Sequence, residues 1–321
     1  MFPHLNFIFS GPEYTSYRPV SDPTGELVLF ERTPTGGGIT ELWLVTLDGT
    51  AYERFIRPGF PDMNTGPSQT RPDWSWVTGQ VALNVAKKND GAVEVLITSA
   101  EGTPLLNVPD SKGYVYPTWT ADGTELIVMN KSGAARPQPQ PSTSLIALDG
   151  SIKQYNLNGK DSAGVLMYGG FATPDARVPT LIAYAGQPAL EGWAGTQGGG
   201  YDQDYNYVFL NSETEGRFES VPMEAQASVA IYEPAYQGRA PVWSPNGQHV
   251  AFESNRAGWY AIYLANLDQK SAPVQITDAS YDAQHPKFRP DGKSLVLTAL
   301  QKPNHKGPRG IAWVDISSYL E

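Results

Sequence analysis

A short pattern recurs along the 321-residue chain, and it limits the possible folds more than any other feature. An internal repeat is typical of solenoids and propellers, in which each unit packs against its neighbours. A degenerate copy, FATPDARVPTLIAY, spans residues 171–184. The clear copies are PVWSPNGQHVAF (241–252), HPKFRPDGKSLVLT (285–298), RPVSDPTGELVLF (18–30), RPDWSWVTGQVALNV (71–85) and YPTWTADGTELIVM (116–129).

Each copy predicts a β-hairpin. A short strand enters a tight turn such as Pro245-Asn246-Gly247, whose glycine accepts a positive φ, and an alternating apolar strand leaves it. Third strands follow, such as ELWLVTL and GIAWVDI, and a fourth usually comes after a second turn. Four strands in roughly 45–55 residues form one propeller blade. We therefore predict an all-β fold, a six-bladed β-propeller of four-stranded blades in one domain over residues 1–321.

The two ends of the sequence predict how the ring closes. The last unit ends with GIAWVDISSYLE and lacks a fourth strand, whereas the chain begins with an unassigned strand, LNFIFS, at residues 5–10. Pairing these strands would leave the ring without an open sheet edge. The N-terminal strand is therefore expected to complete the last blade.

The motif P-x-W-S-P-[DN]-G-x-x-[VIL]-A-F, seen best at residues 241–252, resembles the repeat of the TolB C-terminal propeller and of related WD40-like (PD40) proteins. The resemblance covers about residues 14–316 and implies a propeller fold. It does not imply one function, because propellers serve as transport scaffolds, lyases, peptidase gates and lectins. No segment resembles the N-terminal domain of TolB, so the full role of TolB is not expected.

Composition excludes several classes of site. Without cysteine, the chain has no disulfide, thiolate metal site or cysteine nucleophile. A formal charge of −10 argues against a nucleic-acid partner.

No apolar run approaches the ~18 residues of a membrane span. The first residues do not read as a signal peptide, so we expect a cytoplasmic protein, or a periplasmic or secreted one if a signal has been removed. A monomer is expected.

The long insertions fall at one end of the predicted strands. They follow second strands or join blades, at residues 58–70, 131–142, 186–204, 222–239 and 300–309, while the turns inside the hairpins stay short. Long loops on one rim of a rigid scaffold usually carry function, although surface insertions can also be neutral drift. We therefore place the binding face on the long-loop side.

The residues before the repeat prolines should converge on the axis of that face. Arginine offers planar donors to anions, and tyrosine offers a flat face with a polar tip. Such a funnel would suit an anionic or sugar-like ligand, with Trp193 available for stacking. The predicted ligand-binding residues are Arg18, Arg71, Arg239, His285, Tyr17, Tyr116, Tyr168, Tyr281, Gln284 and Trp193.

Two arrangements are open for the charged groups of this funnel. In one, the arginines and His285 form an arc, with Tyr116 and Tyr168 on the opposite wall. In the other, Arg18 and Arg71 pair with carboxylates such as Asp282 and Asp73 and only join blades. Trp43, Trp119, Trp243 and Trp313 fall at repeat positions and are expected in the core between blades.

A metal site and a catalytic site are weaker predictions. Asp202, Asp204 and Asn206 have a spacing that can present oxygens to Ca²⁺, but the rest of an EF-hand is missing, and a polar loop tip is the favoured explanation. No other cofactor is expected. Of the four histidines, only His285, and His305 from a long loop, are placed for the funnel, so the chain cannot supply the histidine cluster that holds the metal of oligogalacturonate lyases. In an enzyme, His285 and Tyr116 would serve as acid and base.

These observations predict a non-enzymatic recognition propeller that binds a protein, a peptide or an anionic small ligand in the funnel of the long-loop face. The alternative is a lyase or hydrolase that acts on acidic saccharides in the same funnel.

Overall fold

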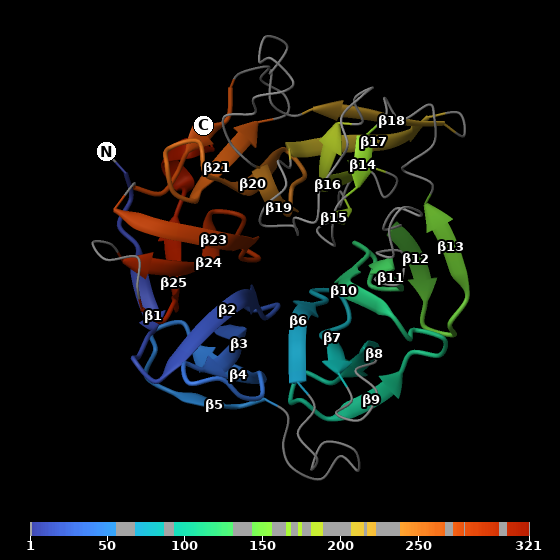
Figure 1. The fold of residues 1–321 in the computed structure, drawn as a ribbon, viewed down its shortest axis with the longest axis horizontal. Coiled ribbons are helices and arrows are strands. Elements are labelled where there is room, and N and C mark those ends of the chain that lie inside the picture. The colour runs from blue at the N-terminus through green and yellow to red at the C-terminus, as the bar shows by residue number, and fades with distance from the viewer. Residues whose placement is uncertain are drawn as a thin grey trace.

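In the computed structural model the β-sheets surround a central axis as a β-propeller (Figure 1). Helix is nearly absent: the described residues contain one short 3₁₀ helix, η3 (Ser317–Tyr319), and none of their helices has the length and hydropathy to cross a bilayer. The structure describes residues 2–55, 68–86, 93–130, 143–155, 165–167, 173–174, 181–188, 207–214, 217–222, 238–266, 272–278, 280–301 and 307–320.

Three four-stranded blades follow one another in the first half of the chain. In each blade the strands pair antiparallel in sequence order, as expected for hairpins joined by short turns. Their strands are β2 (Tyr14–Ser21), β3 (Leu27–Pro34), β4 (Glu41–Thr46) and β5 (Tyr52–Arg54); β6 (Ser68–Trp74), β7 (Val81–Ala86), β8 (Val93–Thr98) and β9 (Pro104–Asn107); and β10 (Tyr114–Trp119), β11 (Glu125–Asn130), β12 (Thr143–Ala147) and β13 (Ile152–Tyr155).

The degenerate repeat does not form a four-stranded blade. Its sheet follows the order β14-β16-β17-β18, and β15 also pairs with β16, so the inner position is divided between two short strands. The copy at residues 171–184 has no glycine for a tight hairpin turn and carries two prolines, so it is the repeat whose sequence departs most from the hairpin pattern. These strands are β14 (Val165–Met167), β15 (Thr173–Pro174), β16 (Leu181–Pro188), β17 (Tyr207–Thr214) and β18 (Arg217–Pro222).

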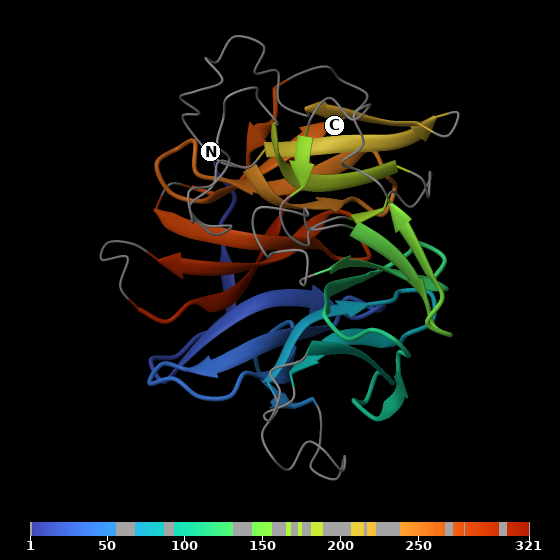
Figure 2. The ribbon, with the colours of Figure 1, turned by 45° about the vertical axis from the view of Figure 1, so that its right-hand side comes forward.

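The prediction of six four-stranded blades is therefore wrong, since the structure has five. The five-stranded β14–β18 sheet lies between the β10–β13 blade and the β19–β22 blade in both ribbon views (Figures 1 and 2). Its strand β16 contacts β19 (Gly238–Trp243). The other strands of that next blade are β20 (His249–Ser254), β21 (Ala261–Asn266) and β22 (Val274–Gln275).

The closing blade confirms that the N-terminal strand completes the last repeat. Its order is β1-β25-β24-β23, and β1 pairs antiparallel with β25, for example Phe7 with Ala312. A Cβ atom on Gly310 would lie 2.7 Å from the Phe9 carbonyl oxygen, so a glycine permits this approach. The four strands are β1 (Asn6–Phe9), β23 (Tyr281–Phe288), β24 (Ser294–Gln301) and β25 (Gly310–Asp315).

The apolar core lies between neighbouring blades. One cluster joins Val20 and Leu29 to Trp74 and Leu83, and another joins the β6–β9 blade to Trp119. Because facing sheets bury their apolar side chains against each other, each blade depends on the next. Trp119 and Trp243 are buried as predicted, whereas Trp43 and Trp313 are only partly buried against the core.

Deleting residues 1–10 should destabilise the whole ring. The deletion removes β1 and two buried side chains, Leu5 and Ile8, and it exposes the edge of β25. The free energy of unfolding should fall by roughly 3–6 kcal/mol, at about 1.5–3 kcal/mol for each buried side chain. Urea unfolding of the purified chain measures this loss.

A shorter deletion provides the control. Removing residues 1–3 takes away the exposed Phe2 but leaves β1, so it should change the unfolding free energy little. Equal stability of the two truncated chains would contradict the role assigned to β1.

Candidate functional site

Each regular blade carries the same backbone irregularity in its first strand. The residues that precede the repeat prolines adopt left-handed φ values: Arg18 (49°), Arg71 (55°), Tyr116 (58°), Ala240 (49°) and His285 (53°). At this point the pairing of the first two strands shifts register. A left-handed conformation costs a non-glycine residue about 1–2 kcal/mol, and a bulge redirects the side chain that it carries.

The five bulged residues and their prolines line a cavity of about 60 Å³, here called the funnel cavity. It is formed by strands β2, β6, β10, β19 and β23, which face the centre of the ring (Figure 1). The structure thus brings together four of the predicted site residues, Arg18, Arg71, Tyr116 and His285. In the β19–β22 blade the equivalent position is Ala240, not Arg239.

A buried glutamate holds the bulge of the β6–β9 blade from the neighbouring blade. Oε1 of Glu31 accepts a hydrogen bond from the backbone N–H of Arg71 at 2.6 Å. Oε2 of Glu31 pairs with Nη1 of Arg18 at 2.8 Å, and the Glu31 side chain is only 3% exposed. One carboxylate therefore supports the bulges of two adjacent blades.

Glu253 repeats this arrangement between the β19–β22 blade and the closing blade. Its Oε2 accepts the backbone N–H of His285 at 2.7 Å, and its Oε1 pairs with Nε of Arg239 at 2.7 Å. Arg239 is buried and stacks on Tyr260, with 4.0 Å between the guanidinium carbon and the ring centroid. Arg239 therefore supports the wall of the funnel and does not line its cavity.

Uncharged side chains take the same role in two other blades. Oδ1 of Asn84 accepts the N–H of Tyr116 at 2.9 Å, and Oγ1 of Thr298 accepts the N–H of Arg18 at 3.2 Å. In all four cases the acceptor lies on the second strand of one blade and the donor on the first strand of the next. These bonds satisfy buried amides that the bulge removes from the sheet ladder.

Arg71 differs from the arginines around it. The described residues place no carboxylate within ion-pair distance of Arg71, whereas Arg18 has Glu31 and Arg309 has Asp282 at 2.7 Å. The guanidinium of Arg71 lies over the Tyr116 ring, 4.2 Å from its centroid. Tyr116 is therefore a stacking partner of Arg71, and its predicted place on the opposite wall is wrong.

Asp282 and Asp73, the carboxylates predicted as alternative partners of Arg18 and Arg71, bind other cations. Asp282 pairs with Arg309, and Asp73 pairs with Lys287 at 2.9 Å. The Asp73–Lys287 pair joins two blades, whereas Asp282 pairs with the residue that precedes β25 of its own blade. The alternative of blade-joining pairs is therefore wrong in its partners, and only Asp73 joins two blades.

His285 lies partly buried in a cationic part of the funnel. Its Nδ1 is 3.4 Å from Oγ1 of Thr298, and its ring meets Tyr17 edge-on at 6.2 Å. Burial, and then the positive charges of Arg18, Arg239 and Arg309, lower the pKa of His285 well below its usual value. The imidazole of His285 is therefore neutral at pH 7. The pKa of Arg18, in contrast, is raised, because the charge of Glu31 and the hydrogen bond to it outweigh the effect of burial.

The other predicted residues contribute less to the cavity. Tyr281 packs against the core of the closing blade, and Gln284 donates to Asp282 at 3.2 Å. Among the residues that the structure describes, no three His, Cys, Asp or Glu side chains form a group that could hold a metal ion. Tyr168, Trp193, Asp202, Asp204 and Asn206, like most of the long insertions, lie outside the described residues.

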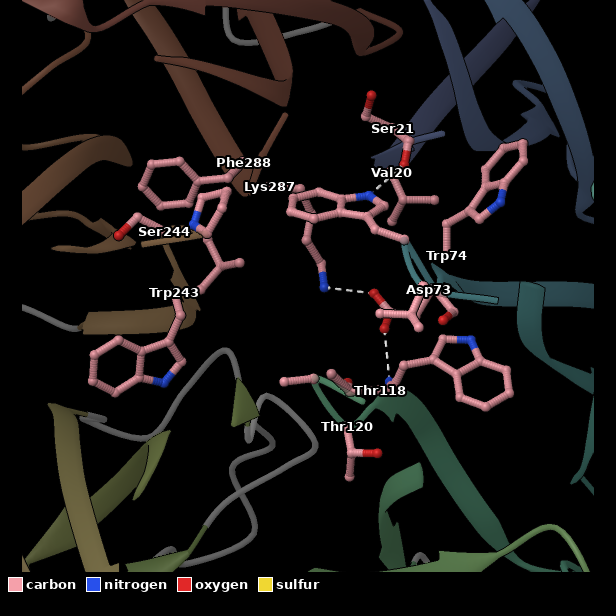
Figure 3. A pocket seen from close by; sticks show the side chains of 17 residues that line it. Val20, Ser21, Asp73, Trp74, Thr118, Thr120, Trp243, Ser244, Lys287 and Phe288 are labelled. Atoms are coloured by element: carbon pink, nitrogen blue, oxygen red, sulfur yellow. Dashed lines mark hydrogen bonds and ion pairs between the residues drawn. The ribbon is translucent and has the colours of Figure 1, made fainter. Parts of the chain in front are cut away.

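A second cavity, missed by the sequence analysis, opens beside the short hairpin turns. This turn-side cavity has a volume of about 220 Å³ and is lined by residues of three such turns, among them Trp76, Ala121 and Pro245. In Figure 3 the indoles of Trp74 and Trp243 extend away from its centre.

The residues that follow the repeat prolines form the boundary between the two cavities. Four of them, Val20, Asp73, Thr118 and Lys287, line both. The Lys287–Asp73 ion pair lies in the middle of this layer (Figure 3), and the second oxygen of Asp73 accepts the N–H of Trp119 at 2.8 Å. Their shared repeat position and opposite charges were the available sequence signal.

Comparison with known proteins identifies the fold and no closer family. No protein-family model matches the chain, and no curated protein matches it. A protein assigned as TolB from Agrobacterium tumefaciens is similar in structure, with a TM-score of 0.56 and 15% identity over 88% of this chain and 87% of that one.

Two further solved structures show the same fold. An oligogalacturonate lyase in complex with manganese has a TM-score of 0.53 and 14% identity over 98% of this chain and 93% of its own. The β-propeller domain of the Trilobed protease from Pyrococcus furiosus has a TM-score of 0.53 and 12% identity, covering 94% and 95%. At such identities the likeness establishes the propeller fold alone.

Replacing Glu31 with alanine should strongly destabilise the protein. The change leaves the guanidinium of Arg18 and the buried amide of Arg71 without their acceptor. Breaking a buried pair in this way costs about 3–5 kcal/mol, which chemical denaturation measures. Glu31→Gln, which keeps one oxygen acceptor, should lose less.

Glu26→Ala is the matched control, because Glu26 is an exposed glutamate just before the same strand. A loss as large as that of Glu31→Ala would show that the Glu31 bridge has no special role.

His285 should make the stability depend on pH. Its folded-state pKa is lowered, so the unfolded chain takes up a proton first as the pH falls below about 6.5. The contribution of His285 is complete above that pH and is lost as the pH falls toward the folded pKa. Urea unfolding at about pH 8 and about pH 5 should show a smaller acid loss for His285→Gln than for the wild type. Identical losses would contradict a neutral, partly buried imidazole.

Proposed function

We propose that this chain is a non-enzymatic recognition propeller whose funnel cavity binds an anionic group of a small ligand or peptide. The observation that carries the proposal is Arg71. Arg71 lines the cavity, its guanidinium lies on Tyr116, and the described residues supply no carboxylate to neutralise it. A guanidinium held over an aromatic ring is oriented in advance for planar recognition of a carboxylate.

The charges around Arg71 support an anion in this cavity. Arg18, Arg239 and Arg309 each have a carboxylate partner, yet after burial, the largest cause, their positive charges also lower the pKa of His285. This positive region lies within a chain of formal charge −10, whose other surfaces would repel the same ligand. The funnel therefore offers a localised site for an anion.

Arg71→Gln should weaken binding of acidic probes without unfolding the protein. The probes are a short polyglutamate peptide and a galacturonate trisaccharide, each compared with its uncharged counterpart, polyglutamine or galactose trisaccharide. Loss of a hydrogen bond to a charged group costs about 1.5–3 kcal/mol, which predicts a dissociation constant about 10- to 100-fold larger. Isothermal calorimetry gives the affinities, and the preferred probe identifies the ligand class.

Arg54→Gln is the control, since Arg54 is an exposed arginine paired with Glu41 on an outer strand. Binding to the wild type should also weaken as salt rises from 0.15 M to 1 M, because the Debye length falls from about 8 Å to about 3 Å. Equal losses in both arginine variants, or salt-independent binding, would refute the proposal.

A second candidate is a lyase or hydrolase that acts on acidic saccharides. The observation that favours it is the neutral imidazole of His285 in a cavity that also contains Arg71 and Tyr116, since a neutral histidine can accept a proton. The same galacturonate trisaccharide tests it. Cleavage that is abolished in His285→Gln, seen by chromatography of the products, would replace the recognition function with catalysis.

A further inference from the structure

The turn-side cavity has the size of a small-molecule site. Its volume of about 220 Å³ exceeds the ~150 Å³ of an apolar cavity that accepts benzene. Val20, Val242 and Phe288 supply apolar walls from three different blades. An aromatic ring with a short polar tail would fit such a space, since small-molecule sites combine apolar walls with a few polar groups.

The mouth of this cavity carries apolar side chains that face solvent. Trp76 is 37% exposed and Val77 is 66% exposed, and both lie on the same turn. The indole Nε1 of Trp76 donates to the carbonyl oxygen of Ser21 at 3.1 Å, so the hydrogen bond fixes the ring against the neighbouring blade. An indole fixed in this way provides a preformed flat surface for stacking.

The inner end of the cavity offers hydrogen bonds but little net charge. Lys287 has three N–H donors, and the described chain shows a single partner for its ammonium, the Oδ1 atom of Asp73. Lys287 is 30% exposed, so its ammonium can donate to a ligand while it keeps that partner. A carboxylate placed there would lie close to the charge of Asp73, whereas an uncharged carbonyl would accept from Lys287 without this repulsion.

From these features we infer that the turn-side cavity is a second ligand site, which takes an uncharged aromatic compound bearing an amide or a similar carbonyl group. The ring stacks on Trp76 and the carbonyl oxygen accepts from Lys287. Thr118 lines both cavities, as Lys287 does, and its hydroxyl can accept a hydrogen bond from the N–H of the amide. This site lies at the other end of the axis from the funnel cavity, and it does not depend on the function proposed for the funnel.

The test uses the full chain and 3-phenylpropanamide as the probe, followed by calorimetry. Two compounds serve as controls: 3-phenylpropionate, which has similar size but a negative charge, and propionamide, which lacks the ring. The amide should bind more tightly than either. Trp76→Ala should weaken it about 10-fold through lost stacking and contact area.

Two further variants locate the site. The double change Asp73→Asn with Lys287→Met removes both charges together, and it should weaken the amide and remove the discrimination against 3-phenylpropionate. Arg71 lines only the funnel cavity. Arg71→Gln should therefore leave the binding of 3-phenylpropanamide unchanged while it weakens the binding of the acidic probes. A crystal of the complex should place the phenyl ring against Trp76.

Three results would overturn the inference. They are no binding of 3-phenylpropanamide to the wild type, unchanged affinity in Trp76→Ala, and an affinity that falls in Arg71→Gln. Failure of the funnel proposal alone looks different, because the acidic probes would then be insensitive to Arg71→Gln while Trp76→Ala still weakens the amide.

Discussion

The geometry of the axis depends on hydrogen bonds that cross from one blade to the next. In four blades the first strand leaves the regular ladder at the residue before proline, and its amide finds an acceptor on the preceding blade. Where that acceptor is Glu31 or Glu253, the same carboxylate also holds an arginine. The unfavourable left-handed conformation therefore persists because the neighbouring blade stabilises it. Blade packing, bulge and cavity lining form one structural unit.

This unit distributes charge along the axis in layers. The layer of residues before the prolines is cationic, and Arg71 is the arginine there that the described residues do not neutralise. The following layer contains the balanced pair of Lys287 and Asp73. Beyond it, the turn-side cavity has apolar walls. The two proposed ligands differ for this reason. The anion is proposed for the funnel cavity, where Arg71 is not neutralised, and the uncharged aromatic compound for the turn-side cavity, where Asp73 already neutralises Lys287.

The sequence predicted what depends on local pattern and on the count of strands. The hairpins follow from turn glycines and from alternation, signals that lie within a few residues of each other. The closing strand β1 follows from the count, because the last repeat lacks a fourth strand and the first residues supply one. The blade count failed at residues 171–184, where the turn signal is missing. Four cavity residues were predicted because one repeat position converges on the axis.

The partners of those residues could not be predicted, for a different reason. Glu31 reaches Arg71 across 40 residues, and Asp73 reaches Lys287 across 214. Such pairs depend on the relative register of separate blades, which the sequence pattern of one blade does not contain.

The recurrence of the bulge has a consequence for how such a protein can change. Five equivalent backbone positions carry arginine, arginine, tyrosine, alanine and histidine, with φ values between 49° and 58°. The backbone therefore tolerates side chains of very different size and charge at one repeat position. Ligand preference can diverge by exchange of these five side chains while the sheets keep their pairing, so the ring separates the requirements of folding from those of specificity.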